Sequence, residues 1–293
     1  MTGDPPEELG LRHSAAVAPS LADDPAPSLP LLRRIADTLG VDRAVAFTVL
    51  ARAWSSLAGI GTLLFIARFL SPAEQGFYYT FYSLVALQIV FELGFSVVIL
   101  QTASHEAAHL EIAPDGSITG PEQAHGRLAN VLQKSVHWYT TAAVLMALTL
   151  VPVGLAFFRH ADRGPHAVAT VHYVLPWLLV VLASSCTFQI DPLFSFLEGC
   201  GYVPEVARTR LWQSLSGTVL GWSAFLVHRG LFAPGCFIFG QALAGGWLLY
   251  TRRGLLLPLM RHASGAFRID WRREVWPFQW RIAISWLAGY VTS

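Results

Sequence analysis

Charged side chains are scarce in this chain. Only 13% of its 293 residues are Asp, Glu, Lys or Arg, while 54% are hydrophobic, and the mean hydropathy is +0.47. A soluble domain usually carries about 25% charged residues. This composition excludes an ordinary soluble domain and indicates a chain that spends most of its length in a lipid bilayer.

Cysteine is also rare, and its spacing forms no motif. Cys186, Cys200 and Cys236 lie in or beside apolar runs, without a C-x-x-C pair. This spacing argues against a disulfide framework and a structural zinc site, so we expect three buried, small apolar side chains. The chain also lacks a phosphate-binding glycine loop and a G-x-S-x-G nucleophile elbow. We therefore expect no cofactor.

The N-terminal segment lacks the features of a signal peptide. Residues 1–30 are rich in Pro, Ala and Asp, with no basic start followed by an apolar run. We expect a disordered cytoplasmic tail, and the first membrane span must then direct insertion. Beyond residue 30, apolar residues recur opposite two arginines, which predicts a short juxtamembrane helix that completes the segment 1–42.

Long apolar runs dominate the rest of the chain. Six of them reach the roughly 20 residues that a helix needs to cross a bilayer. They cover approximately residues 44–67, 77–101, 136–158, 171–194, 211–231 and 232–250. We predict an all-α integral membrane protein in which residues 43–250 form a six-transmembrane-helix lobe.

A seventh apolar run begins near Phe278 and reaches Ser293. Its length of about 16 residues is short of a full span. We therefore expect 278–293 to be a truncated seventh transmembrane helix, in a fragment or the product of a truncated gene. The preceding segment, 251–277, is basic and contains two tryptophans. Indole and guanidinium groups favour the headgroup layer, so we predict an amphipathic cytoplasmic linker on the anionic lipids of the inner leaflet, not a nucleic-acid site.

Arginine and lysine are distributed unevenly between the two sides of the predicted membrane. With the N-terminus inside, most of them fall in the inner segments, and the outer segments hold only Arg68, Arg159, Arg163 and Arg229. Cytoplasmic loops are enriched in basic residues. The N-terminus is therefore predicted to be cytoplasmic.

One arginine and one glutamate lie inside the first two apolar runs. Arg52 lies 16 residues before Arg68, where the first run ends, and Glu92 lies 16 residues after Gly76, where the second begins. In an antiparallel hairpin that rises ~1.5 Å per residue, both lie ~24 Å from the turn. Because an isolated charge inside a bilayer is costly, this symmetry predicts a matched ion pair.

Polar residues continue from both charges at helical spacing. They are Ser55, Ser56, Gly59 and Thr62 in the first run, and Gln88 and Ser96 in the second. Lipid cannot satisfy these groups, so both faces need protein or a water-filled cavity. The pattern leaves two interpretations open: the wall of a cavity, or an ion pair that only fixes helix packing.

The fourth run ends with Asp191 and Pro192, followed by Glu198. The proline is expected to free backbone groups and bend the helix. Both carboxylates fall near the inner boundary, where solvated carboxylates are ordinary, so we do not expect them to relay protons.

The segment from His105 to His109 matches the zinc motif H-E-x-x-H, with Glu106 in the position of the base. It follows the second run instead of lying within a span, and Ile112 occupies the glycine position of the extended motif. Third-ligand candidates without a supporting pattern are Asp115, Glu122, His125 and Asp191. A zinc-dependent membrane protease stays an alternative to surface histidines at a helix end.

Several blocks carry a family pattern. They are Arg52-Ala53-Trp54-Ser55, the turn from Leu70 to Tyr79 (Leu-Ser-Pro-Ala-Glu-Gln-Gly-Phe-Tyr-Tyr), Phe91-Glu92-Leu93-Gly94, Phe196 to Gly201 and Trp276 to Arg281. In these blocks the chain resembles polysaccharide and O-antigen flippase-like proteins of the multidrug/oligosaccharidyl-lipid/polysaccharide exporter superfamily. The resemblance implies two six-helix lobes around a cavity that opens alternately to each side, and polyprenyl-diphosphate-linked glycans as substrates.

The resemblance also implies that Arg52 and Glu92 line this cavity, with Gln88 and Arg281 as weaker candidates. A guanidinium suits a diphosphate because its fork of donors pairs two phosphate oxygens. We therefore predict a non-enzymatic transporter of the bacterial inner membrane, which needs the missing C-terminal lobe or a second copy. Two competing hypotheses are a multidrug or cation antiporter of the same superfamily and a non-transporting remnant.

Overall fold

The structure is a computed structural model, and it describes residues 43–92, 94–113, 116–161 and 171–262, with the single residues Trp276, Trp280, Arg281 and Ile284. The chain divides into two units, Met1–Val41 and Asp42–Ser293, and every described residue belongs to the second. The tail and juxtamembrane helix predicted at 1–42 lie outside the described residues. Most of the predicted seventh helix at 278–293 and the end of the predicted linker at 251–277 also lie outside the described residues.

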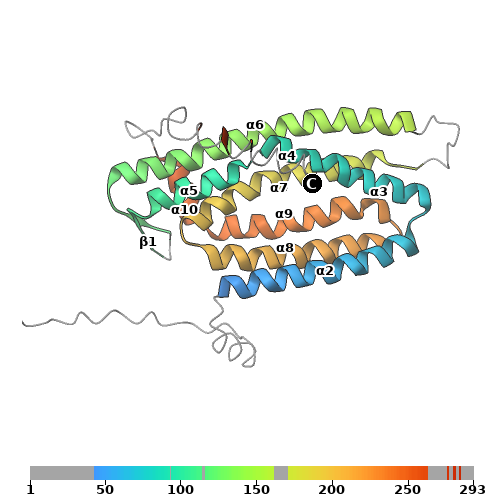
Figure 1. Cartoon of the computed structure of the whole chain (residues 1–293), viewed down its shortest axis with the longest axis horizontal. Coiled ribbons are helices and arrows are strands. Elements are labelled where there is room, and N and C mark those ends of the chain that lie inside the picture. The colour runs from blue at the N-terminus through green and yellow to red at the C-terminus, as the bar shows by residue number, and fades with distance from the viewer. Residues whose placement is uncertain are drawn as a thin grey trace, which may run out of the picture. The chain divides into compact units, whose positions relative to one another are not determined.

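Helices make up almost all of the described chain (Figure 1). They are α2 (Arg43–Phe69), α3 (Pro72–Val85), η1 (Ala86–Gln88), α4 (Ile89–Glu92), α5 (Phe95–Ala107), α6 (Glu122–Ala161), α7 (Val174–Gly199), α8 (Val203–Leu226), η2 (Gly230–Phe232), α9 (Ala233–Thr251) and α10 (Arg253–Arg261). A short antiparallel hairpin of β1 (Glu111–Ile112) and β2 (Ile118–Thr119) connects α5 to α6. The predicted all-α class is confirmed.

Four helical segments of the described chain are long and apolar enough to cross a membrane, where the sequence predicted six. They are α2, α6, α7 and the segment Gly230–Thr251, which contains α9. The predicted span at 211–231 is wrong because α8 carries charged residues in its first half and several serines beyond them. The predicted span at 77–101 is wrong because its helix is interrupted. The four segments make the chain a multi-pass membrane protein.

The interrupted run begins with a well-formed cap. The Ser71 hydroxyl accepts a hydrogen bond from the Glu74 amide (3.4 Å), while the Ser71 amide donates to the Glu74 carboxylate (2.9 Å). This reciprocal capping box starts α3, and Pro72 occupies a first-turn position where it needs no hydrogen bond. α3 ends at Val85, η1 and α4 follow as far as Glu92, Gly94 adopts a left-handed conformation with φ 71°, and α5 begins at Phe95. Glycine accepts this conformation because it has no Cβ.

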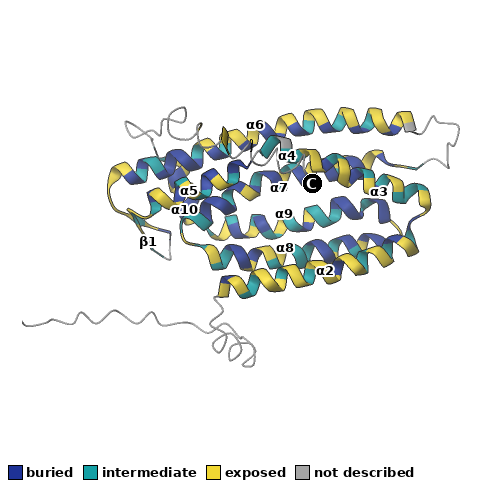
Figure 2. Cartoon of the chain, viewed as in Figure 1, coloured by how far each residue is buried: buried dark blue, intermediate teal, exposed yellow. Residues whose placement is uncertain are grey.

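The helices pack in a defined order. α2 packs on α8, α8 on α9, α9 on α7, and α7 on both α5 and α6 (Figure 1). The large core between α5, α6 and α7 buries aromatic and aliphatic side chains such as Tyr139, Trp177 and Phe196. By contrast, α2 buries only Ala44, Ala58 and Ile66, and most of its surface is exposed (Figure 2). Its exposed leucines and isoleucine suit contact with lipid.

The three cysteines are free, and only two of them are shielded from solvent. Cys200 and Cys236 are half-buried, whereas Cys186 is exposed on α7. The prediction of three buried side chains is therefore wrong for Cys186. Burial raises the pKa of the Cys200 thiol, just past the end of α7, to about 12. That thiol stays protonated near neutral pH and is a poor nucleophile.

Candidate functional site

A groove of about 400 Å³ lies between α2 and α3, and α8 and α9 complete its walls. Its polar lining residues are Ser55 and Thr62 of α2, Tyr78, Tyr79 and Tyr82 of α3, Ser214 and Thr218 of α8, and Gln241 of α9. Gly59 and several apolar side chains complete the lining. The groove therefore presents hydroxyl or amide groups from all four helices inside a membrane lobe.

The polar stripe predicted on the first run forms one wall of this groove and also holds α2 to α8. Three side-chain hydrogen bonds cross the interface, and they are Trp54 Nε1 to Thr218 Oγ1 (3.2 Å), Ser55 Oγ to Ser214 Oγ (2.8 Å) and Trp222 Nε1 to Thr62 Oγ1 (3.0 Å). Interhelical bonds of this kind are each worth about 0.6 kcal/mol in membrane proteins. The stripe thus packs against α8 and also lines the groove.

Three tyrosines of α3 form the facing wall. Tyr78 is buried, while Tyr79 and Tyr82 are 48% and 38% exposed. The Tyr78 ring lies 5.5 Å from that of Tyr79 and 5.4 Å from that of Tyr82, measured between centroids. Sequence reasoning did not assign these residues to the site. The signal was the i, i+1, i+4 spacing of tyrosines just after the capped start of α3, which places aromatic rings on one side of that helix.

Gly59 marks the open part of the groove. A Cβ added at Gly59 would meet no atom within 4 Å, whereas one added at Gly61 would lie 2.7 Å from the Trp222 ring. The two glycines are two residues apart and therefore face different sides of α2. Because Gly61 has no side chain, α2 can approach α8 closely. The missing side chain of Gly59 instead leaves open volume in the groove. This contrast locates the accessible volume beside the centre of α2.

Arg52 and Glu92, the two predicted site residues, are not brought together. Arg52 is exposed on α2, and no ion pair joins the two side chains in the described part of the chain. In Figure 1, α8 and α9 lie between α2 and α4, the helix that ends at Glu92. The prediction of a matched ion pair is wrong, because the interrupted second run packs on α7 instead of running beside α2. Glu92 Oε1 instead accepts a hydrogen bond from Ser96 Oγ (2.7 Å).

The two weaker candidates also lie apart from the groove. Gln88 is half-buried in η1, and Arg281 is exposed beyond α10. Neither lines the groove or is hydrogen-bonded to Arg52 or Glu92 among the residues that the structure describes. Of the predicted polar positions, the groove therefore collects Ser55, Gly59 and Thr62, and not the charged ones.

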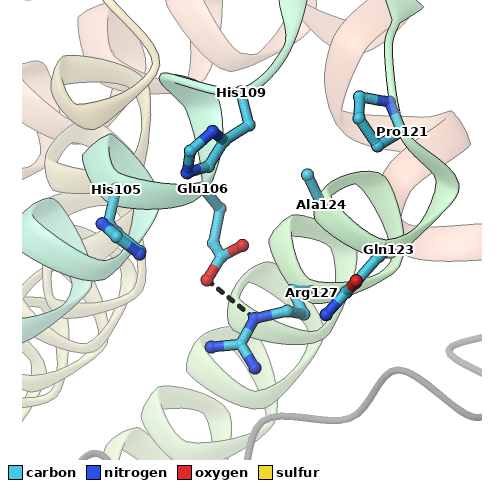
Figure 3. A pocket seen from close by; sticks show the side chains of 7 residues that line it. All are labelled: His105, Glu106, His109, Pro121, Gln123, Ala124 and Arg127. Carbon is cyan, nitrogen blue, oxygen red and sulfur yellow. Dashed lines mark hydrogen bonds and ion pairs between the residues drawn. The ribbon is translucent and has the colours of Figure 1, made fainter.

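The H-E-x-x-H segment lies at the end of α5 in a second pocket of about 370 Å³ (Figure 3). Glu106 points toward Arg127 of α6, whose Nε donates to its Oε1 at 2.8 Å, and the Glu106 side chain is only 5% exposed. The rings of His105 and His109 lie 5.6 Å apart, perpendicular to each other. Because Arg127 occupies the Glu106 carboxylate, that carboxylate is not placed to activate a water molecule.

No third ligand joins the two histidines in the described chain. Within those residues no group of three or more His, Cys, Asp or Glu side chains is placed to hold a metal ion. The His125 ring packs against His262 of the segment after α10, at 4.5 Å between centroids. Asp115 lies outside the described residues. The arrangement matches that of exposed histidines at a helix end.

These features define the chain as a helical multi-pass membrane protein with a hydroxyl-lined groove. Comparison with protein-family models, with curated proteins and with solved structures found no match.

Proposed function

We propose that this chain forms the membrane lobe of a flippase-like transporter for polyprenyl-diphosphate-linked oligosaccharides in a bacterial inner membrane. The observation that carries the proposal is the groove between α2 and α3, which brings together hydroxyl and amide groups from four helices, two of which, α2 and α9, belong to membrane-spanning segments. Polar groups at such depth are costly unless protein, water or a ligand satisfies them. The serine and threonine hydroxyls of the groove already hydrogen-bond within the protein, and their remaining lone pairs can accept hydrogen bonds from a polar ligand.

The groove's two walls suit a sugar. Ser55 and Thr62 supply hydroxyl groups on one side, and the exposed rings of Tyr79 and Tyr82 supply aromatic faces on the other. A sugar ring presents hydroxyl groups at its edge and C–H groups on its face, so it can use both walls at once. Pockets for small polar ligands commonly combine a few placed polar groups with aromatic surface. The hydroxyl groups of Ser55, Thr62, Ser214 and Thr218 are the part of the lining that supports a glycan as the ligand.

We assign Arg52 to the diphosphate of the proposed substrate. It precedes Ser55 by three residues and Gly59 by seven, so it shares the groove-facing side of α2. Its exposed guanidinium has no carboxylate partner among the described residues. With the N-terminus cytoplasmic, Arg52 lies in the inner half of α2, at the leaflet where a lipid-linked glycan is made. The failure of the Arg52–Glu92 pair thus strengthens the case for Arg52, since a guanidinium that no carboxylate engages can pair phosphate oxygens.

The groove lies on one lobe, so we propose that transport requires a companion lobe or a second copy of the chain. Substrate binding requires only the groove, which makes binding the sharper test. The full chain is purified, placed in lipid vesicles and exposed to a photoreactive polyprenyl-diphosphate oligosaccharide, and covalent labelling is measured.

Gly59→Leu provides the test variant, because its side chain would fill the groove without meeting a neighbouring atom at Cβ. Gly246→Leu is the matched control: it is also a glycine of a membrane helix, α9, with nothing within 4 Å of an added Cβ, but it does not line the groove. We expect labelling to fall by on the order of tenfold, equivalent to about 1.4 kcal/mol, in the first variant alone. Equal labelling of wild type and both variants would refute the proposal.

A further inference from the structure

The end of α9 carries an exposed stack of two aromatic rings and one arginine. Trp247 and Tyr250 lie near the end of α9, and Arg253 is the first residue of α10. The ring centroids of Trp247 and Tyr250 are 6.0 Å apart, and the guanidinium carbon of Arg253 lies 4.2 Å from the Tyr250 centroid. Trp247 is 68% exposed and Tyr250 is 58% exposed, so the lobe itself covers little of either ring.

The arginine next to this stack has a different environment. Arg252 is half-buried, its guanidinium carbon lies 4.4 Å from the Tyr202 ring centroid, and it donates to Glu205 Oε1 at 3.1 Å. It therefore connects the end of α9 to the start of α8. Arg253 also stacks on a tyrosine, but it is exposed, and no ion pair engages it in the described part of the chain. A guanidinium of this kind is available to an anion, and its fork of donors fits two phosphate oxygens.

The stack lies where a membrane span ends. The segment Gly230–Thr251 is long and apolar enough to cross a bilayer, and Arg253 follows it by two residues. In Figure 1, α10 lies at the end of the lobe where α2 begins, which is the cytoplasmic end if the N-terminus is inside. Tryptophan and tyrosine concentrate at the headgroup level of a bilayer, and basic residues there attract anionic lipids. The stack therefore falls in the headgroup layer of the inner leaflet.

The exposed side of α10 continues this surface. The helix packs on α6, and its buried side chains are Leu255, Leu256 and Leu259. Leu257 and Met260 are instead 46% and 38% exposed. They follow Arg253 by four and seven residues, so they share its side of the helix. This side combines a positive charge with apolar side chains, as helices that lie on anionic membranes do.

We propose that Trp247, Tyr250 and Arg253 form a binding site for the headgroup of an anionic phospholipid of the inner leaflet. The Arg253 guanidinium pairs the phosphate oxygens, and the Tyr250 ring holds the guanidinium in place from its other face. Trp247 packs beside the headgroup, while Leu257 and Met260 contact the adjoining part of the acyl chains. The site shares no residue with the lining of the groove between α2 and α3.

The charges around the stack favour an anionic over a zwitterionic lipid. Arg261, at the other end of α10, is also exposed, and it too lacks an ion pair among the residues that the structure describes. The nearby carboxylate of Glu205 is engaged by Arg252. The surface is therefore positive, and it repels the ammonium group that a zwitterionic headgroup would bring.

The test uses the purified full chain in neutral detergent with no glycan lipid present, so that its outcome is independent of the proposed function. Native mass spectrometry counts the bound lipid molecules as phosphatidylglycerol is added, and again with phosphatidylcholine of the same acyl chains. We expect the first phosphatidylglycerol to bind about fivefold or more tightly than the first phosphatidylcholine, equivalent to about 1 kcal/mol. Equal affinities for the two lipids would overturn the proposal.

Three variants separate the site from general charge attraction. Arg253→Gln should lower the affinity for phosphatidylglycerol by about fivefold and leave that for phosphatidylcholine unchanged. Tyr250→Leu keeps every charge but removes the ring under the guanidinium, so it should lower the affinity by a smaller factor. Arg208→Gln is the charge-matched control, because Arg208 is an exposed arginine near the start of α8 that is not part of the stack. It should leave both affinities unchanged.

The three side chains are exposed, so each variant should keep the unfolding temperature of the wild type in detergent, and a loss of lipid binding then reports on the site alone. An unchanged affinity in Arg253→Gln would overturn the site. An equal loss in Arg208→Gln would do the same, because it would show attraction to the positive surface in general. A second copy of the chain held in place of lipid, in a dimer that Arg253→Gln dissociates, would also overturn it.

Discussion

Arg127 of α6 donates a 2.8 Å hydrogen bond from Nε to Oε1 of Glu106, within the H-E-x-x-H segment at the end of α5. The bond connects two helices that lie on opposite sides of the β1–β2 hairpin in the chain. Glu106 has the position of a catalytic base in the sequence motif, but in the structure it is one half of a buried ion pair. The pair explains why Glu106 is buried while His105 and His109 are not.

The first prediction concerns this pair. Glu106→Ala should lower the free energy of unfolding by roughly 1–3 kcal/mol, because it removes the buried carboxylate that accepts the hydrogen bond from Arg127 Nε. His105→Ala and His109→Ala should each change it by at most about 0.5 kcal/mol, as surface substitutions do. Chemical denaturation of the three variants in detergent measures the difference. Comparable losses at Glu106 and at both histidines, reversed by added zinc, would instead indicate a metal site.

The second prediction follows from the separation of Arg52 and Glu92. Had they formed a buried pair, Arg52→Ala would destabilise the chain more than Arg52→Ala combined with Glu92→Gln. Since the two side chains share no contact in the described structure, their effects on unfolding should add within about 0.5 kcal/mol. A double-mutant cycle measures this coupling. A coupling energy well above that limit would show that Arg52 and Glu92 do interact as a pair.

The third prediction uses two glycines of α2. Gly61→Ala should destabilise the lobe by roughly 1–3 kcal/mol, because the new Cβ would lie 2.7 Å from the Trp222 ring and would disturb its hydrogen bond to Thr62. Gly59→Ala meets open space and should be neutral or slightly stabilising, since alanine favours a helix more than glycine does. The unfolding free energies of the two variants check the expectation. Equal destabilisation would mean that α2 does not pack on α8 as described.

Several elements follow from the sequence with little error. The first, fourth and sixth apolar runs were predicted at 44–67, 171–194 and 232–250, and the helices cover Arg43–Phe69, Val174–Gly199 and Ala233–Thr251. Each is an uninterrupted apolar run, where hydropathy alone indicates a helix. The third run, by contrast, was predicted at 136–158, while α6 extends from Glu122 to Ala161. Its first turns are amphipathic, and their helical state depends on packing against α5 and α10, which hydropathy does not register.

The candidate site was predicted in part. Helical spacing correctly placed Ser55, Gly59 and Thr62 on one side of α2, where they line the groove. The tyrosine wall was missed because it comes from a different helix, and spacing along one helix says nothing about its neighbour. Pairing Arg52 with Glu92 assumed two straight, adjacent helices, whereas the second run is interrupted by η1 before it reaches Glu92, and it packs on α7.

The order of residues by itself determined the helical class, the membrane setting, the capped turn at Ser71 and the polar face of α2. These properties arise from hydropathy, spacing and capping, which act over a few residues. Only the tertiary structure decided that α2 meets α8 and that Arg127 pairs with Glu106. Those partners are distant in the chain, and which of them meet depends on where one helix breaks and which faces then pack together.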